Sequence, residues 1–218
     1  MISVLVPSRG RPKLLHESID SLGVGDFEIL AYVDNDDPCL SEYIKVPTTY
    51  TLVGKRHGYP GLQHYINDLC KIATGDWLFL WNDDALMRTG NWWKKVPETT
   101  RPEVINFDSN PLNNLFPLVS RQVYEAMGHF SLSPHNDSWV QDIANKVGIH
   151  THVPGVEVYH RRLELNDQTK SETQAAYATT SPAYDAMWEL RDKDAKKIME
   201  VLWKLGFADL VNLVFQPH

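Results

Sequence analysis

The sequence has few of the features that mark secreted, membrane or zinc-binding proteins. Only 2 of its 218 residues are cysteine, too few for a disulfide framework, so we expect a reducing, cytoplasmic location. No apolar run reaches the ~18 residues that a membrane helix needs, and residues 1–12 lack the basic segment of a signal peptide. The 9 histidines show no spacing typical of zinc ligands. We therefore expect no membrane insertion and no zinc site.

Positive charge is also scarce, because 21 Lys and Arg residues stand against 28 Asp and Glu residues, a net charge of −7. An acidic chain lacks the basic footprint that is typical of nucleic-acid binding, although a local patch can act against the net charge. Carboxylates gathered around Mg²⁺ or Mn²⁺ would use the acidic excess. The glycine spacings of the Rossmann fingerprint and of the P-loop are missing, which excludes both motifs.

The apolar residues, 43% of the chain, are arranged as expected for an α/β protein. Residues 2–7 predict a buried strand, a helix follows from Pro12 to the break at Gly23, and residues 27–33 predict a second strand. This order favours a parallel sheet. We predict further strands at 50–53, 77–81, 104–107, 116–119, 149–153 and 156–159, and further helices at 62–73, 121–127 and 139–147.

Three polar clusters directly follow predicted strands, where α/β sheets open into a ligand crevice. Asn82-Asp83-Asp84 offers oxygen ligands for Mg²⁺ or Mn²⁺. Residues 34–37 (DNDD) can accept hydrogen bonds from a ribose hydroxyl or a base N–H. Arg9-Gly10-Arg11 offers two guanidinium groups to a diphosphate. Each cluster is equally compatible with a solvated turn, because Asn, Asp and Gly favour turns.

Two further residues are candidates for chemistry. Asp137 follows Asn136 at the start of a predicted helix, where it is either an N-cap or a general base for an attacking hydroxyl. His160 ends the predicted strand 156–159 and is either structural or a ligand.

The order of these pieces resembles the GT-A glycosyltransferases, closest to the inverting family 2 type. The segments that carry the resemblance are ISVLVPSRGRP, YVDNDDP, ATGDWLFLWNDDA, SRQVYEAMGHF, HNDSWVQDIANKVG and VPGVEVYH. Asn82 stands where that family usually has the first acid of its Asp-x-Asp metal motif, and Asn136 stands where it usually has Glu. The resemblance covers residues 1 to about 160, and the chain is also similar in size to short members carried by phages.

The resemblance implies a GT-A fold with a mostly parallel central sheet flanked by helices and a C-terminal helical extension. It implies Mn²⁺ or Mg²⁺ as cofactor and a UDP-sugar, with UDP-glucose as a candidate, as donor. Asp137 would be the catalytic base, and Asp84 and His160 would contact the metal. The donor would contact Pro7, Arg9, Asp34, Asp36, Asn82 and Asp83.

We expect residues 1–160 to form the donor-binding and catalytic domain, and residues 161–218 to form an extension that shapes the acceptor site. In the extension, the polar residues 163–181 predict a loop or lid, and residues 182–205 predict one long helix. A hydroxymethylated pyrimidine in phage DNA is a candidate acceptor, as are glycans and small molecules. A nucleotidyltransferase and a non-catalytic sugar-nucleotide-binding module are the alternative functions. The sequence leaves the sugar, the acceptor and the oligomeric state open.

Overall fold

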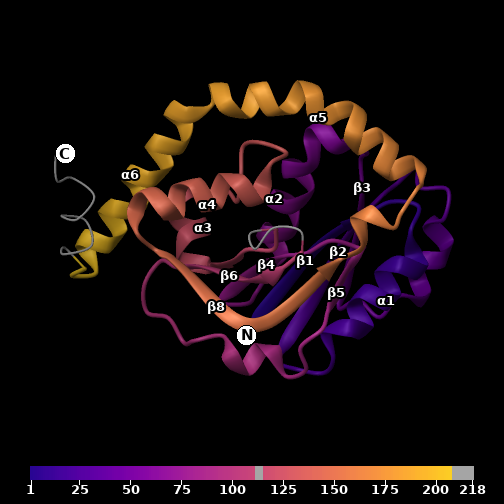
Figure 1. The fold of residues 1–218 in the computed structure, drawn as a ribbon, viewed down its shortest axis with the longest axis horizontal. Helices are drawn as coiled ribbons and strands as arrows, with labels where there is room; N and C mark the ends of the chain where they lie inside the picture. The colour runs from indigo at the N-terminus through magenta and orange to yellow at the C-terminus, as the bar shows by residue number, and fades with distance from the viewer. Residues whose placement is uncertain (111–114, 208–218) are drawn as a thin grey trace.

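The computed structural model describes residues 1–110 and 115–207, so the end of the predicted extension, 208–218, lies outside the described residues. Within them, one sheet of eight strands has the order β3-β2-β1-β4-β7-β6-β8-β5 (Figure 1). Four of the seven neighbouring pairs are parallel and three are antiparallel, which confirms a mostly parallel sheet. The strands are β1 (Ile2–Ser8), β2 (Phe27–Asp34), β3 (Tyr50–Gly54), β4 (Trp77–Leu80), β5 (Ala85–Met87), β6 (Val104–Ser109), β7 (Leu118–Ser120) and β8 (His150–His160).

Helices flank this sheet, as expected for the predicted α/β class (Figure 1). They are α1 (Pro12–Leu22), α2 (Leu62–Ile72), α3 (Arg121–Met127), α4 (Asn136–Val147), α5 (Gln168–Ala186) and α6 (Trp188–Lys204). Short 3₁₀ turns are η1 (Leu40–Lys45), η2 (Tyr59–Gly61), η3 (Trp92–Lys95) and η4 (Arg161–Leu163). Among the described residues, no helix is both long enough and apolar enough to cross a lipid bilayer.

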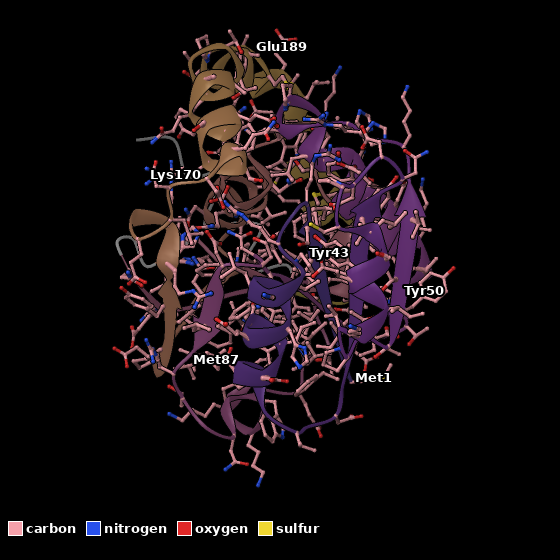
Figure 2. All side chains as sticks on the ribbon, turned by 90° about the vertical axis from the view of Figure 1, so that its right-hand side faces the viewer. Met1, Tyr43, Tyr50, Met87, Lys170 and Glu189 are labelled. Carbon is pink, nitrogen blue, oxygen red and sulfur yellow. The ribbon has the colours of Figure 1, made fainter. Side chains whose placement is uncertain are left out.

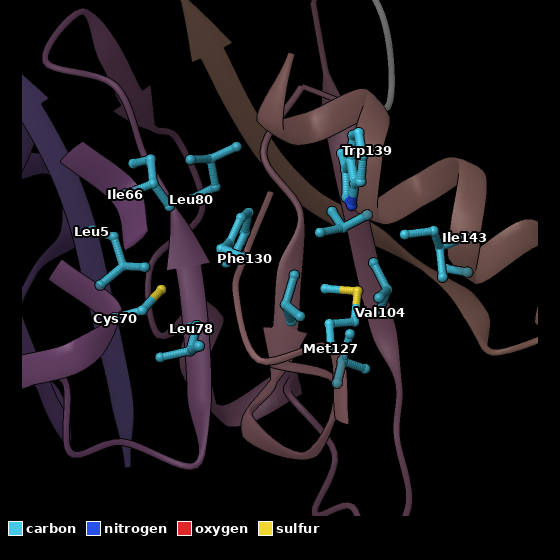
Figure 3. Packing of buried hydrophobic residues seen from close by; sticks show 14 of the residues in the cluster. Leu5, Ile66, Cys70, Leu78, Leu80, Val104, Met127, Phe130, Trp139 and Ile143 are labelled. Atoms are coloured by element: carbon cyan, nitrogen blue, oxygen red, sulfur yellow. The ribbon is translucent and has the colours of Figure 1, made fainter. Parts of the chain in front are cut away.

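The alternation of side chains along β1 divides the core into two layers. Val4 and Val6 face one layer, in which α1 and a group of tryptophans pack. Leu5 faces the other layer, where residues of α2, α4 and α6 are buried. Figure 3 shows Phe130 and Trp139 in this layer. Because β1 is buried on both faces, its continuous apolar run predicted a central strand correctly.

The extension is helical as expected, but the loop predicted at 163–181 and the single helix predicted at 182–205 are wrong. Residues 163–181 are mostly helical rather than a loop, because α5 begins at Gln168 with the Asp167 side chain accepting a hydrogen bond from the Lys170 backbone N–H. The expected single helix 182–205 is two helices, since Pro182 lies inside α5 and the chain bends at Met187. The Arg191 side chain donates to the carbonyl of Tyr184 near the end of α5, which also accepts a hydrogen bond from the backbone N–H of Met187, so that the two helices are tied together at the bend.

Other differences are small and have local causes. The strands expected at 149–153 and 156–159 are one strand, β8, with an irregularity in its pairing between Phe107 and Asp108 of β6. The short strand β5 was not predicted, because three residues carry no periodic signal. Helix α4 begins at Asn136, three residues earlier than expected, so Asp137 lies in its first turn rather than at its N-cap.

Candidate active site

The carboxyl ends of β1, β2 and β4 meet beneath α5 and line a cavity of about 260 Å³. In Figure 2 Met1, at the start of β1, lies in the lower half of the molecule, and Lys170 of α5 lies in the upper half. Eight of the predicted site residues line this cavity, and Asp36 does not. The eight are Pro7, Arg9, Asp34, Asn82, Asp83, Asp84, Asp137 and His160.

The turn after β1 sends its two arginines to different acidic groups. Gly10 has a φ of 67°, a conformation that favours glycine, and its N–H donates to an oxygen of Asp37 at 2.7 Å. Before it, Arg9 donates to Asp34 at 3.0 Å and to Asp36 at 2.6 Å. After it, Arg11 turns toward the acidic pair that follows β4. The turn therefore neutralises two carboxylate clusters at once.

Only one of the two carboxylate oxygens of Asp34 is available to a ligand. Its carboxylate is buried at the end of β2, and Arg9 binds Oδ2. The other oxygen, Oδ1, is buried and has no hydrogen-bond partner among the described residues. A buried acceptor without a donor is costly. An N–H or O–H group of a ligand in the cavity would satisfy it.

The acidic pair Asp83 and Asp84 is buried but not symmetric. Ser8 donates to Asp83 at 2.8 Å and Arg11 donates to it at 3.2 Å. Burial raises the pKa of Asp83 to about 6, against the lowering effect of Arg11. Burial opposes ionisation of Asp84 as well, but the hydrogen bond with His160 and the positive charges nearby hold its pKa below the usual range.

Strand pairing brings His160 to Asp84. In the antiparallel pair β5–β8, Ala85 lies opposite His160, so the residue before Ala85 reaches the histidine ring. The Nε2 atom of His160 lies 3.0 Å from Oδ1 of Asp84 and 3.4 Å from the amide nitrogen of Asn82. The sheet therefore brings together two residues that are 76 positions apart in the sequence.

These groups fit a divalent cation that is shared with a ligand. Among residues 1–110 and 115–207, no three His, Cys, Asp or Glu side chains form a complete metal site. The 3.0 Å between Asp84 Oδ1 and His160 Nε2 matches the ~3 Å between neighbouring ligands that each lie about 2.1 Å from an octahedral ion. Mg²⁺ typically binds one or two protein groups and completes its shell with phosphates and water.

Asp137 forms a second, separate acidic position in the cavity. In the first turn of α4 its Oδ1 accepts a hydrogen bond from the Ser138 N–H at 2.8 Å. Burial raises the pKa of its carboxyl group. Tyr59 of η2 lies nearby, and burial together with the negative charge of Asp137 raises the pKa of Tyr59 to about 12. A carboxylate in such surroundings accepts a proton more readily than an ordinary aspartate does.

The extension forms a wall of the cavity that sequence analysis did not resolve. Its lining residues come from η4, α5 and the segment between them and include Arg162, Leu165, Thr169, Lys170, Glu172, Thr173 and Gln174. Arg11 was seen only as part of a turn cluster, yet its Nε and Nη2 bind both carboxylate oxygens of Asp167, at 2.8 and 2.6 Å. No local pattern signals this contact, because the two residues are 156 positions apart.

Comparison with known proteins shows which proteins this chain is similar to in its fold. No protein-family model and no curated protein matches the chain. Among solved structures, mannosyltransferase PcManGT from Pyrobaculum calidifontis, with GDP-Man and Mn²⁺, has a TM-score of 0.60 at 14% identity, covering 95% of this chain and 72% of that one. S. aureus TarS in complex with UDP has a TM-score of 0.56 at 14% identity, covering 84% and 73%.

A third neighbour is glucosyl-3-phosphoglycerate synthase from Mycobacterium tuberculosis, in complex with Mn²⁺, UDP and phosphoglyceric acid. Its TM-score is 0.56 at 14% identity, and the match covers 74% of this chain and 70% of that one. The three neighbours are GT-A glycosyltransferases. The expectation from the sequence segments is therefore confirmed at the level of the fold: this chain has the GT-A fold of glycosyltransferases.

Proposed function

We propose that the protein is a metal-dependent, inverting glycosyltransferase that moves a sugar from a UDP-sugar to an acceptor hydroxyl. The observation that carries this proposal is that Asp34, Asp84 and Asp137, from three distant segments, line one cavity. The fold supports it, since two neighbours with this fold are glycosyltransferases that hold GDP-Man or UDP with Mn²⁺, and a third is in complex with UDP. UDP-glucose is the candidate donor within this class.

The donor side of the cavity is the edge formed by β1, β2 and β4. The free Oδ1 of Asp34 would accept a hydrogen bond from the base or ribose, and Pro7 and Arg9 would border the nucleoside. Asp84 and His160 would hold Mn²⁺ or Mg²⁺, with Asn82 and Asp83 beside them. When bound, the cation would stabilise the negative charge of the leaving diphosphate.

The charges near Asp84 agree with this assignment. Asp83, Asp84 and Asp167 carry three negative charges around the single positive charge of Arg11. Arg11 alone therefore leaves an excess of negative charge at this position, which a divalent cation would offset. Burial of unbalanced charge is costly, and the raised pKa of Asp83 is one result of that cost.

Asp137 would act as general base on the acceptor side. Its carboxylate would take the proton of the acceptor hydroxyl while the acceptor oxygen bonds to the anomeric carbon and the bond from that carbon to the diphosphate breaks. The proton passes to Asp137, the sugar passes to the acceptor oxygen, and UDP leaves. A single displacement of this kind inverts the anomeric carbon, so the product has the opposite anomeric configuration to the donor.

The extension would form the acceptor side of the cavity. We propose that residues 1–160 bind the donor and that residues 161–218 contribute to the acceptor site. Arg162 and Lys170 line the cavity, and within the described chain neither pairs with a carboxylate; Lys170 donates to the carbonyl of Leu165 instead. Two such cations favour an anionic acceptor, which supports a hydroxymethylated pyrimidine in DNA over a neutral glycan. Acceptor binding should then weaken steeply with salt.

A thermal-unfolding screen followed by product analysis tests the proposal. A ligand that binds the folded state raises the melting temperature, so UDP should raise it more with Mn²⁺ than without. Incubation with UDP-sugars and candidate acceptors should then release UDP and form a glycoside. Release of pyrophosphate from nucleoside triphosphates would indicate a nucleotidyltransferase, and binding without any transfer or hydrolysis would indicate a binding module.

A further inference from the structure

We propose that Asp167 is a positioning residue, which holds the guanidinium of Arg11 away from Asp84 and so keeps this carboxylate free for the cation. The inference rests on the proposed role of Asp84 and His160 in metal binding. It assigns to the C-terminal extension a part in the donor site, whereas the sequence suggested only an acceptor role.

The geometry of Arg11 carries the inference. Its side chain is 9% exposed and lies between the extension and the acidic pair. The Nε and Nη2 atoms bind both oxygens of Asp167, so this pair has the two-point form in which arginine holds a carboxylate most firmly. The remaining nitrogen, Nη1, lies 3.2 Å from Asp83 but 3.9 Å from Asp84. Each of the three guanidinium nitrogens therefore donates a hydrogen bond to a carboxylate other than Asp84.

Without the Asp167 carboxylate, Arg11 would lose the contact that holds its guanidinium in this position. An arginine–carboxylate hydrogen bond is about 2.7–2.9 Å long, so a shift of about 1 Å would bring Nη1 from its present 3.9 Å into direct contact with Asp84. The released guanidinium would remain buried beside two carboxylates, which makes that shift favourable. It would place a fixed positive charge against Oδ2 of Asp84, on the same carboxylate whose Oδ1 lies beside His160 and is proposed as a metal ligand.

One substitution separates this effect from folding. Asp167 is also the N-cap of α5, where it accepts a hydrogen bond from the Lys170 N–H. Asparagine caps helices as well as aspartate does, so Asp167→Asn keeps the start of α5 but loses the charged, two-point contact with Arg11. Glu17→Gln is the matched control, because it removes a carboxylate outside the cavity lining that pairs with Arg161 of the extension rather than with Arg11.

The test measures Mn²⁺ affinity of the full chain in the presence of UDP, by electron paramagnetic resonance of free Mn²⁺. Substituting a residue that supports a metal ligand typically weakens binding about 10–100-fold, and we expect Asp167→Asn to fall in this range. Asp167→Glu should recover part of the affinity, and Glu17→Gln should change it less than about threefold. In an Arg11→Met background, Asp167→Asn should have almost no effect, because no guanidinium is left to move.

Two results would overturn the inference. If Asp167→Asn weakens Mn²⁺ binding equally with and without Arg11, Asp167 acts only through its charge. If it leaves the affinity unchanged, Arg11 does not compete for Asp84. Arg11→Lys replaces Arg11→Met should the latter not fold, since lysine cannot form the two-point contact. Failure of the wild-type protein to bind Mn²⁺ at all would instead remove the proposed function, and this inference with it.

Discussion

Asp83 provides a test of the buried acidic pair that needs no substrate. The side chain is 8% exposed, and burial raises its pKa to about 6, whereas the ordinary value is 3.8. The folded protein therefore holds this proton more tightly than the unfolded chain does. The resulting stability is present at low pH and is lost as the pH rises through about 6.

The size of this loss of stability follows from the two pKa values, about 6 in the folded protein and 3.8 in the unfolded chain. Between about pH 5 and about pH 7.5, this carboxyl should cost the folded state about 1 to 2 kcal/mol of stability. Asp83→Asn removes the titration and keeps an acceptor for Ser8 and Arg11, so the variant should gain stability relative to wild type as the pH rises. The depressed pKa of Asp84 acts at lower pH and does not interfere.

Urea unfolding with EDTA present, at both pH values, measures this difference. EDTA matters because a bound cation would stabilise the ionised pair. The expected result is a stability difference between variant and wild type that grows by about 1 to 2 kcal/mol from pH 5 to pH 7.5. A stability difference that stays constant, or that shrinks, would show that the folded protein does not hold the Asp83 proton more tightly than the unfolded chain does.

Three further predictions concern the core, the donor and the base. Leu202→Ala in α6, fully buried, should destabilise the protein by about 2–5 kcal/mol in urea unfolding, and a smaller loss would show that α6 is not part of the core. Asp34→Asn should weaken UDP binding about 10–100-fold by calorimetry, whereas Asp36→Asn, outside the cavity, should change it little; equal effects would refute this. Transfer should fall on the acid side with an apparent pKa above the ~3.9 of an ordinary aspartate, and an ordinary value would contradict the burial of Asp137.

Segments with a strong local pattern were predictable from the sequence. The apolar run of β1 and the helix α1, with Pro12 at its start and Gly23 after its end, were predicted almost to the residue. Helix α3 was predicted with its observed bounds, Arg121–Met127. Acidic residues placed after β2 and β4 were expected to meet, and the parallel pairing of β1 with both strands brings them to one cavity.

Features that depend on tertiary contacts were not predictable. Helix α5 has only Thr180 buried, so it lacks the apolar stripe by which amphipathic helices are detected. Its position depends on contacts such as Arg11 with Asp167 and Arg56 with Glu172, which join distant parts of the chain. The contact of Asp84 with His160 was not predictable either, because it depends on the register of the unpredicted strand β5.

The most direct test of the account compares Asp84→Asn with Asp137→Asn in two assays, UDP binding with and without Mn²⁺ and sugar transfer. Asp84→Asn should abolish the gain in UDP affinity that Mn²⁺ gives. Asp137→Asn should bind UDP and Mn²⁺ like wild type yet transfer sugar at least about 100-fold more slowly. Transfer that survives in Asp137→Asn, or metal-dependent binding that survives in Asp84→Asn, would contradict the division of the cavity into a metal side and a base side.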